Sequence, residues 1–284
     1  MATSSPLTTT LSRPDLAIRA SAALALWTAI LGLAACNIQV RENGDVKVGL
    51  FSAQATDDWT RTYPLAAGGR IEVVNLNGPI DVSEAPAGAN VEVHASIVAK
   101  ALTDAGAKDV LARGRIQETA SPAAVKIETV MPRPNPGSYE VRYTIQVPPG
   151  VETQVSTTNG LVKATGLTGK LKASAVNGPI ELIDMAGALD AASVNGPVSA
   201  KLTNVTGPVR LETTNGRLTL EIPKASRANL AARVVNGSLN VSGFAVQEQR
   251  GNRVRNLEIV LNGGGPPIDL RTTNGRMTIT GTGN

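Results

Sequence analysis

Hydrophobic and polar residues alternate on both sides of a recurring Asn-Gly dipeptide. In seven of the nine such dipeptides, the third and fifth residues after the asparagine are apolar and the fourth is polar. The fourth and sixth residues before it are also apolar, with Thr153 as the single exception. Because successive side chains of a strand point to opposite faces, this pattern predicts a half-buried β-strand on each side of the dipeptide. The seven dipeptides are Asn77-Gly78, Asn159-Gly160, Asn177-Gly178, Asn195-Gly196, Asn215-Gly216, Asn236-Gly237 and Asn274-Gly275.

The spacing of these dipeptides indicates a repeat. From Asn159 to Asn236 the intervals are 18, 18, 20 and 21 residues, and the next interval, to Asn274, is 38, about twice 19. A fixed period near 20 residues is typical of stacked-repeat folds. The sequence therefore predicts an all-β, single-domain parallel β-solenoid with about 18 to 21 residues per rung. Glycine would take a positive φ at each corner, and stacked asparagines would hydrogen-bond along the axis.

A β-meander is the alternative, with each Asn-Gly forming a type I′ hairpin turn. A meander needs no constant rung length, whereas a solenoid needs equivalent residues in columns, and the alignment shows columns. Asn43 matches the pattern only downstream, through Val46 and Val48, and Asn262 matches on neither side. These two are predicted to be ordinary loop turns.

Composition and the remaining segments refine this picture. Aromatic residues make up 2% of the 284-residue chain, so the core must be narrow and aliphatic. Rungs from Ile71 to Ile279 would give roughly ten turns and a rod about 50 Å long. Alternation predicts further strands, and a helix is expected as an insertion near 100–123, with a loop-rich excursion at 245–267. The strands are predicted at 90–99, 124–131 and 139–147, and the helix at 101–116.

The N-terminal segment predicts export. Arg13 and Arg19 precede an apolar run, residues 20–35, which is shorter than the roughly 20 residues that a bilayer span needs. The chain is thus predicted to comprise a signal peptide, 1–35, a tether, 36–67, and the solenoid, 68–284. An ordinary signal peptide or an uncleaved short anchor helix are the alternatives.

The end of this run, Leu33-Ala34-Ala35-Cys36, resembles the lipobox of bacterial lipoproteins. The resemblance implies that Cys36, the single cysteine, is acylated and anchors the protein to a membrane of the bacterial cell envelope. Asn37 at the next position implies sorting to the outer membrane if the source is Gram-negative.

The segments 139–150, YEVRYTIQVPPG, and 155–160, VSTTNG, followed by further Asn-Gly rungs, resemble the bacterial putative-adhesin repeat family. The resemblance covers Gly68 to the C-terminus. It implies a right-handed β-helix similar to autotransporter adhesin heads, and it carries no catalytic residues.

The inventory of reactive side chains excludes several classes of site. One His and one Cys rule out a disulfide and any metal cluster built on Cys and His, and no metal or cofactor is expected. His94 lies in a strand pattern without the partners that a general base needs. Glu181, Asp184 and Asp190 could form an acidic cluster of the kind that cleaves glycosides, but nearby lysines favour a solvated face. We therefore predict that the protein is not an enzyme.

Basic charge is concentrated in the C-terminal part of the chain. From Val209 onward there are 10 basic and 5 acidic residues, against 15 and 17 in 37–208. The hypothesis is that this part meets an anionic glycan or an acidic envelope-protein patch, with simple solubility as the alternative. Nucleic acid is not expected as a partner, because basic residues are not interleaved with aromatic ones. The residues predicted to face a ligand are Arg210, Arg217, Arg233, Arg250, Arg253, Arg255, Arg271 and Arg276.

These observations predict a lipid-anchored, non-catalytic cell-envelope protein that acts as an adhesin-like binding or scaffold module. A self-associating structural protein is the alternative, because terminal strand edges can pair with another chain. An enzyme that acts on polysaccharides is a further alternative.

Overall fold

The computed structural model describes residues 37–40, 46–49, 53–65, 68–134, 136–244, 248–250 and 255–283. The predicted signal peptide, Cys36 and Arg253 lie outside this set. Strands β1 (Asn37–Val40) and β2 (Val46–Gly49) form a separate antiparallel pair. No helix within the described ranges is both long and apolar enough to cross a membrane.

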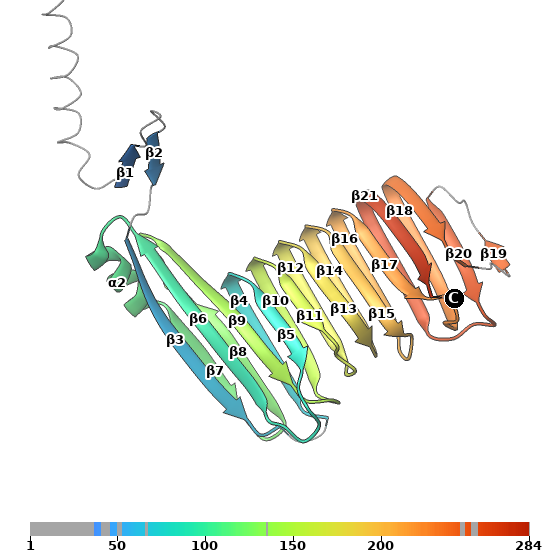
Figure 1. The fold of residues 1–284 in the computed structure, drawn as a ribbon, viewed down its shortest axis with the longest axis horizontal. Coiled ribbons are helices and arrows are strands. Elements are labelled where there is room, and N and C mark those ends of the chain that lie inside the picture. Colours follow the sequence, from blue (N-terminus) through green and yellow to red (C-terminus); the bar gives the residue numbers. More distant parts are fainter. Residues whose placement is uncertain are drawn as a thin grey trace, which may run out of the picture.

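The body of the protein is a solenoid-like rod of stacked rungs (Figure 1). Each rung has one strand before an Asn-Gly corner and one after it, and equivalent strands of neighbouring rungs pair in parallel. We call the surface of the strands before the corners face A and that of the strands after them face B. Parallel pairing rules out the meander. The first five rungs are β4 (Arg70–Asn77) with β5 (Ile80–Glu84), β10 (Glu152–Asn159) with β11 (Val162–Thr165), β12 (Leu171–Asn177) with β13 (Ile180–Ala186), β14 (Leu189–Asn195) with β15 (Val198–Asn204), and β16 (Val209–Asn215) with β17 (Leu218–Pro223).

Two more rungs are continuous strands that bend through the corner, β18 (Ala228–Ser242) and β21 (Pro267–Thr282). Along the axis, β21 lies between the β16–β17 rung and β18, although it follows β18 in the sequence. The residues between them include β19 (Glu248–Arg250) and β20 (Asn256–Leu261), which add antiparallel strands beyond β18 on face A. The predictions of ten turns and of a purely loop-rich excursion at 245–267 are therefore wrong. The rod has seven Asn-Gly rungs, because the residues between them build caps at both ends.

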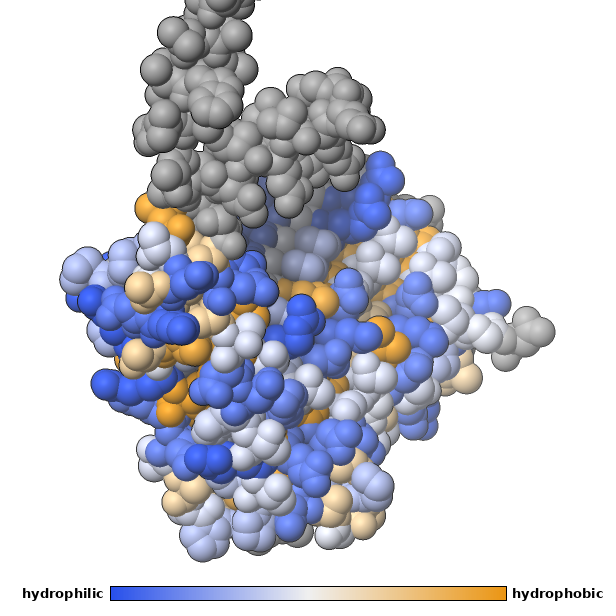
Figure 2. Space-filling model, turned by 60° about the vertical axis from the view of Figure 1, so that its left-hand side comes forward, coloured by the Kyte–Doolittle hydropathy of each residue, from blue (hydrophilic) through white to orange (hydrophobic). Residues whose placement is uncertain are grey.

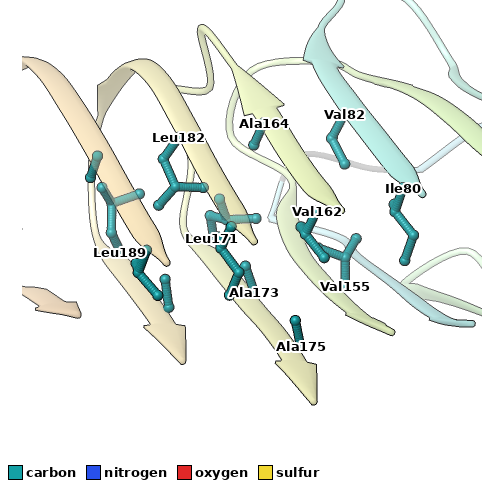
Figure 3. Close-up of a cluster of buried hydrophobic side chains, with 14 of the residues drawn as sticks. Ile80, Val82, Val155, Val162, Ala164, Leu171, Ala173, Ala175, Leu182 and Leu189 are labelled. Carbon is teal, nitrogen blue, oxygen red and sulfur yellow. The ribbon is translucent and has the colours of Figure 1, made fainter. Parts of the chain in front are cut away.

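The predicted apolar columns form the core between the two faces. Val155 and Leu171 on face A meet Val162 and Leu182 on face B, and all four side chains are at most 2% exposed (Figure 3). Buried alanines such as Ala173 keep the two faces close together. The interior is therefore narrow and aliphatic, as the composition predicts.

Antiparallel strands close the N-terminal end. β8 (Ala124–Val130) and β9 (Ser138–Val147) pair in parallel with β4 and β5, and antiparallel strands then continue each face outward. These are β7 (Arg115–Ala120) beside β8, and β6 (Val91–Ala101) followed by β3 (Ala53–Tyr63) beside β9. The helix α2 (Asp104–Arg113) contacts β3 and β6. The strand predictions at 90–99, 124–131 and 139–147 are confirmed, whereas the helix predicted at 101–116 is shorter, because β7 begins at Arg115. β3 belongs to the sheet, so the predicted tether at 36–67 overlaps the folded body.

Aromatic side chains fill part of the interior at this end of the rod. Tyr139 and Tyr143 are buried there, and the Tyr143 hydroxyl hydrogen-bonds to Thr129 Oγ1 at 2.7 Å. Burial is the main cause that raises the pKa of Tyr139 to about 12. Figure 2, which brings this end forward, shows mostly hydrophilic residues with scattered hydrophobic patches.

The seven corner asparagines form one continuous ladder. In each pair of neighbouring rungs, the asparagine nearer the distal end of the rod donates through Nδ2 to Oδ1 of the other asparagine, at 2.7–3.0 Å. The ladder starts at Asn77, which donates to the Tyr139 carbonyl at 3.4 Å, and ends at Asn236. Asn262 lies outside it and donates to the carbonyls of Lys224 and Ser226, as a loop turn would. The prediction of stacked asparagines is confirmed.

The corner glycines are required mainly because the rungs approach each other closely. A Cβ on Gly178 would lie 1.9 Å from the Gly160 carbonyl oxygen, and one on Gly196 would lie 2.1 Å from that of Gly178. Gly78 and Gly160 have positive φ values of 115° and 155°, but Gly178 and Gly196 do not. The prediction that every corner glycine needs a positive φ is therefore wrong.

A buried hydroxyl column lies two residues before the asparagines. Thr213 Oγ1 donates to the Gly196 carbonyl at 2.8 Å, and Ser193 Oγ donates to that of Gly178 at 2.9 Å. Both side chains are at most 4% exposed. These bonds satisfy corner carbonyls that point into the core, where an unpaired acceptor is costly.

Candidate functional site

Charged side chains alternate along the outer surface of face A. The strand register places Lys172, Asp190, Arg210 and Asp269 side by side on successive strands. The next two positions of this row are Ala231 and Glu258. Opposite charges on neighbouring strands stabilise a sheet modestly, so most of this row is balanced.

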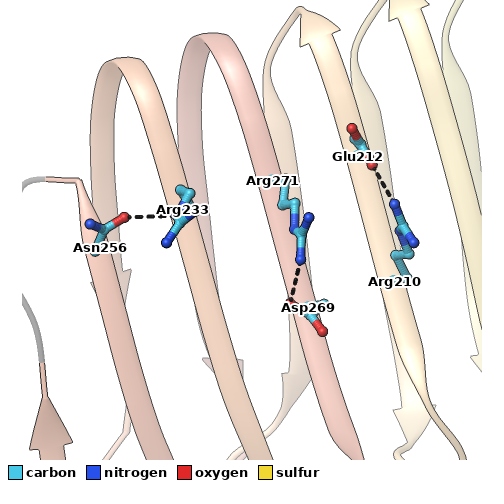
Figure 4. Close-up of polar contacts among 6 residues, drawn as sticks. All are labelled: Arg210, Glu212, Arg233, Asn256, Asp269 and Arg271. Carbon is cyan, nitrogen blue, oxygen red and sulfur yellow. Dashed lines mark hydrogen bonds and ion pairs between the residues drawn. The ribbon is translucent and has the colours of Figure 1, made fainter.

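Two of the arginines predicted to face a ligand are held by acids of their own strands (Figure 4). Arg210 Nη2 lies 2.9 Å from Glu212 Oε2, and Arg271 Nη2 lies 3.7 Å from Asp269 Oδ1. The hydrogen bond to Glu212 raises the pKa of Arg210 above its ordinary value, and Asp190 and Asp269 add to this effect. The positive charge of Arg210 is therefore balanced by the adjacent Glu212 carboxylate. Arg271 has a longer ion pair and is held more loosely.

Arg233 differs from these two. Its Nε donates to Asn256 Oδ1 at 3.3 Å, and no carboxylate lies within ion-pair distance of it among the described residues (Figure 4). In the part of the chain that the structure describes, the guanidinium thus has a neutral partner only, and several of its donors remain for a ligand.

Arg233 lines a hollow of about 440 Å³ on face A. The hollow forms because Ala231 occupies the row position between Asp269 and Glu258, and an alanine leaves space where its neighbours carry long side chains. Arg271 and Arg233 stand on adjacent strands in the next outward row. The lining residues are Ala231, Ala232, Arg233, Asn256, Leu257, Glu258, Asp269, Leu270 and Arg271.

A second hollow, of about 270 Å³, lies on the same face. Ala188, Pro208 and Pro267 line it, with Arg210 and Asp190 beside them, and Asp269 borders both hollows. The two hollows share Asp269 and follow one another across the strands from β12 to β20, and we call them together the face A groove. A groove of this direction suits an extended ligand that lies along the rod.

Comparison with family models identifies the fold. Residues 40–280 match the family described as Toastrack DUF4097. The chain belongs to this family. No curated protein matches the chain.

Solved structures that match this Toastrack chain have low sequence identity. A putative cell adhesion protein from Clostridium sporogenes is 11% identical, covers 80% of this chain and 100% of its own, and has a TM-score of 0.48. A putative adhesin from Bacteroides fragilis is 14% identical, with coverages of 80% and 97% and a TM-score of 0.33. A putative lipid binding protein from Parabacteroides distasonis is 11% identical, with coverages of 80% and 97% and a TM-score of 0.23.

The other arginines of the predicted set lie elsewhere on the Toastrack rod. Arg217 and Arg276 directly follow corner glycines on adjacent rungs, and both are exposed. Arg255 is exposed in the turn before β20. Arg250 belongs to β19, but its side chain is outside the described set, as is all of Arg253. The predicted set is thus divided between face A, the corner and the distal turn.

The predicted acidic cluster does not form on the Toastrack rod. Glu181 lies on face B and Asp190 on face A, so the core separates them. Asp184 is not in a turn: it has a φ of 54° at a bulge inside β13, and it pairs with Lys201 at 2.8 Å. The prediction that Glu181, Asp184 and Asp190 could form one acidic cluster is therefore wrong.

His94 is an outward residue of β6, as its strand pattern predicts. Its Nδ1 lies 3.0 Å from Thr60 Oγ1, and its Nε2 lies 3.7 Å from Asp58 Oδ1. Among the described residues, no group of three or more His, Cys, Asp and Glu side chains is arranged to hold a metal ion.

Sequence reasoning missed most residues of the groove, among them Ala231, Asn256 and Glu258. Ala231 is outward in the strand pattern, but its small size has meaning only once its neighbours are known. Those neighbours come from β21 and β20, which are brought together by the altered rung order. The sequence did point to Arg210, Arg233 and Arg271, and the last two share one position relative to the corner.

Proposed function

We propose that this protein is a non-catalytic, adhesin-like binding module of the bacterial cell envelope, in which the face A groove binds an extended polysaccharide that carries carboxylates. The observation that carries this proposal is Arg233. Its guanidinium lines the larger hollow and, among the described residues, is hydrogen-bonded only to the Asn256 amide. A planar guanidinium with free donors is well suited to a carboxylate.

The balance of charge around the groove restricts the partner. Arg233 and Arg271 line the larger hollow together with Glu258 and Asp269, so this distal part of the groove has no net charge. A polymer with dense negative charge would be repelled by these acidic side chains. A hydroxyl-rich chain with widely spaced carboxylates fits better, and this narrows the anionic glycan expected from the sequence.

The groove has no aromatic side chain among the residues that line it, so stacking on sugar rings cannot contribute. The contacts would therefore be hydrogen bonds, ion pairs and apolar contacts with Ala188, Pro208 and Pro267, each of them weak, and the ionic ones partly screened by salt. Useful affinity would come from repetition along the polymer, because several weak contacts within one ligand act together.

Replacing Arg233 by alanine should weaken binding to hyaluronan, which has a carboxylate on every second sugar, by about five- to tenfold. The charge-assisted bond to the ligand would be lost, while the exposed position leaves the fold intact. The measurement is biolayer interferometry at low and at moderate salt, with uncharged dextran as the control ligand.

Arg217→Ala is the matched control variant, because Arg217 is an exposed arginine at the corner and away from the groove. It should leave the affinity within about twofold of the wild type. Equal losses for the two variants, or binding that does not respond to salt, would count against the groove as the binding site.

The location of the module is part of the proposal. We infer that residues 1–35 are a signal peptide and that acylated Cys36 anchors the rod through the following segment. The support is the sequence, since both lie outside the described residues. Cys36→Ser should move the protein from the membrane fraction to the soluble fraction, and retention in the membrane would contradict the lipid anchor.

A further inference from the structure

Among the described strands, the distal half of β18 has a partner on one side only. β21 pairs with β18 along its whole length, from Asn229 to Ser242. On the outer side, β20 pairs with 228–233, and the Val234 N–H donates to the Arg255 carbonyl. From Val235 to Ser242, no described strand covers the outer side. We call this segment, 235–242, the open edge.

The open edge lacks the usual protection against pairing with another chain. Edge strands are commonly protected by charged residues or proline. β3, at the opposite end of the rod, contains Asp57, Asp58 and Arg61, and β7 contains Arg115 and Glu118. The open edge reads VNGSLNVS, with no charge and no proline.

Three features of the open edge show that one more rung would fit there. Leu239 and Val241 are only partly buried, whereas the equivalent Met277 and Ile279 of the neighbouring rung are fully buried. The asparagine ladder ends at Asn236, which donates to Asn274 and has no donor to its own Oδ1 among the described residues. Each corner glycine beyond Gly78 also sits over the carbonyl of the corner glycine in the preceding rung of the rod, so the next corner must be glycine as well.

The chain contains one further segment with this pattern, Asn43-Gly-Asp-Val-Lys-Val48. It has apolar residues at the third and fifth positions after asparagine, a polar residue between them and glycine at the corner. Asn43 is outside the described residues, and Val46 and Val48 belong to β2, whose described partner β1 occupies one side of it. The segment therefore supplies the side chains that the open edge lacks.

The segment cannot reach the open edge of its own rod. Four residues separate Val48 from Ala53, where β3 begins, and the five Cα-to-Cα steps span at most about 18 Å. From β3 to β18 there are nine strand-to-strand steps, or about 43 Å at about 4.8 Å each. The occupant must therefore come from another molecule.

We propose that the open edge binds residues 43–48 of a second copy of this chain as a parallel strand, with Asn43 extending the asparagine ladder beyond Asn236. Val46 and Val48 cover the columns of Leu239 and Val241, and Lys47 lies beside Asn240. The contact is heterologous, because it joins the distal end of one rod to the N-terminal segment of the next, and its repetition gives an open chain of rods. This association is independent of ligand binding in the face A groove.

Disulfide cross-linking of the full chain in mild detergent tests this proposal. With Cys36→Ser in the background, Lys47→Cys combined with Asn240→Cys should give a series of covalent dimers, trimers and larger species on a non-reducing gel. Adjacent positions on parallel strands lie within the 4.4–6.8 Å Cα separation that a disulfide spans. Lys47→Cys combined with Val241→Cys is the matched control and should stay monomeric, because these side chains point to opposite faces.

Three results would overturn the proposal. Equal cross-linking of both pairs would show that there is no fixed register. Dimers formed by Asn240→Cys alone would show that two open edges pair with each other, and the absence of cross-links in every variant would show that the open edge does not bind this segment. As an independent readout, Val241→Lys should weaken association by at least about tenfold in sedimentation velocity, because it buries a charge at the joint. Circular dichroism checks that this variant is folded.

Discussion

Replacing Gly178 by alanine is expected to reduce the free energy of unfolding by more than about 3 kcal/mol. The new Cβ would lie 1.9 Å from the carbonyl oxygen of Gly160 and 2.7 Å from its carbonyl carbon. Neither rung can move away easily. The Gly160 N–H donates to the Asn177 carbonyl and Asn177 Nδ2 donates to Asn159 Oδ1, so moving the two rungs apart stretches both bonds. Urea denaturation followed by circular dichroism measures the change.

Gly166→Ala is the control for this experiment. Gly166 has a φ of 74°, and a Cβ there would have no atom within 4 Å. The cost is then the strain of a left-handed alanine, about 1–2 kcal/mol. If Gly178→Ala costs no more than Gly166→Ala, close stacking of the corners is not what requires glycine.

The Gly178→Ala variant should also unfold less cooperatively. In stacked-repeat proteins each repeat contacts only its neighbours, so stability depends on the interfaces between adjacent repeats. A clash between the second and third rungs weakens one such interface. A second transition in the denaturation curve is therefore expected.

Replacing Thr213 by valine is expected to cost about 1–3 kcal/mol of stability. The two side chains have nearly the same shape, but valine cannot donate to the Gly196 carbonyl, which Thr213 Oγ1 contacts at 2.8 Å. Thr213 is 1% exposed, so water does not easily replace the lost donor. Thermal or urea denaturation provides the measurement.

Thr219→Val is the matched control. Thr219 lies on face B, whereas the hydroxyl column lies on the face A side of the corner. Its side chain points outward between the buried Leu218 and Leu220. Its substitution should change stability by less than about 0.5 kcal/mol. Similar losses for the two variants would mean that the buried hydroxyl column contributes nothing specific.

The stack of rungs was predictable because every rung repeats the same alternation around Asn-Gly. Parallel pairing, the aliphatic columns and the asparagine ladder follow from that repetition. The hydroxyl column was not predicted, although Thr157, Ser193, Thr213 and Thr272 share one position before the asparagine. A polar residue at a buried position contradicts simple alternation, and its role becomes clear only when the corner carbonyl beside it is known.

The order of the last two rungs could not be predicted. An interval of 38 residues, about twice the period, suggests two rungs in series. The chain instead forms β18, adds β20 beyond it, and returns to place β21 next to β16 and β17. Every rung has the same local pattern, so nothing in the pattern itself specifies which rung is adjacent to which.

The candidate site depends on this order. The larger hollow exists because Ala231 of β18 lies between Asp269 of β21 and Glu258 of β20. The sequence identified Arg233 and Arg271 as basic residues of the C-terminal rungs. It could not show that Arg271 is tied to Asp269 while Arg233 contacts only an amide.

Disulfide formation at the exposed positions just before the corner asparagines tests the stacking and its order most directly. In a Cys36→Ser background, Thr214→Cys with Thr273→Cys should form an intramolecular disulfide in high yield, because these residues occupy neighbouring rungs. Thr214→Cys with Val235→Cys should not, because the β21 rung separates them by about 9.6 Å. Efficient bonding of Thr214→Cys to Val235→Cys, with none to Thr273→Cys, would show rungs stacked in sequence order and would contradict both the fold and the groove built on it.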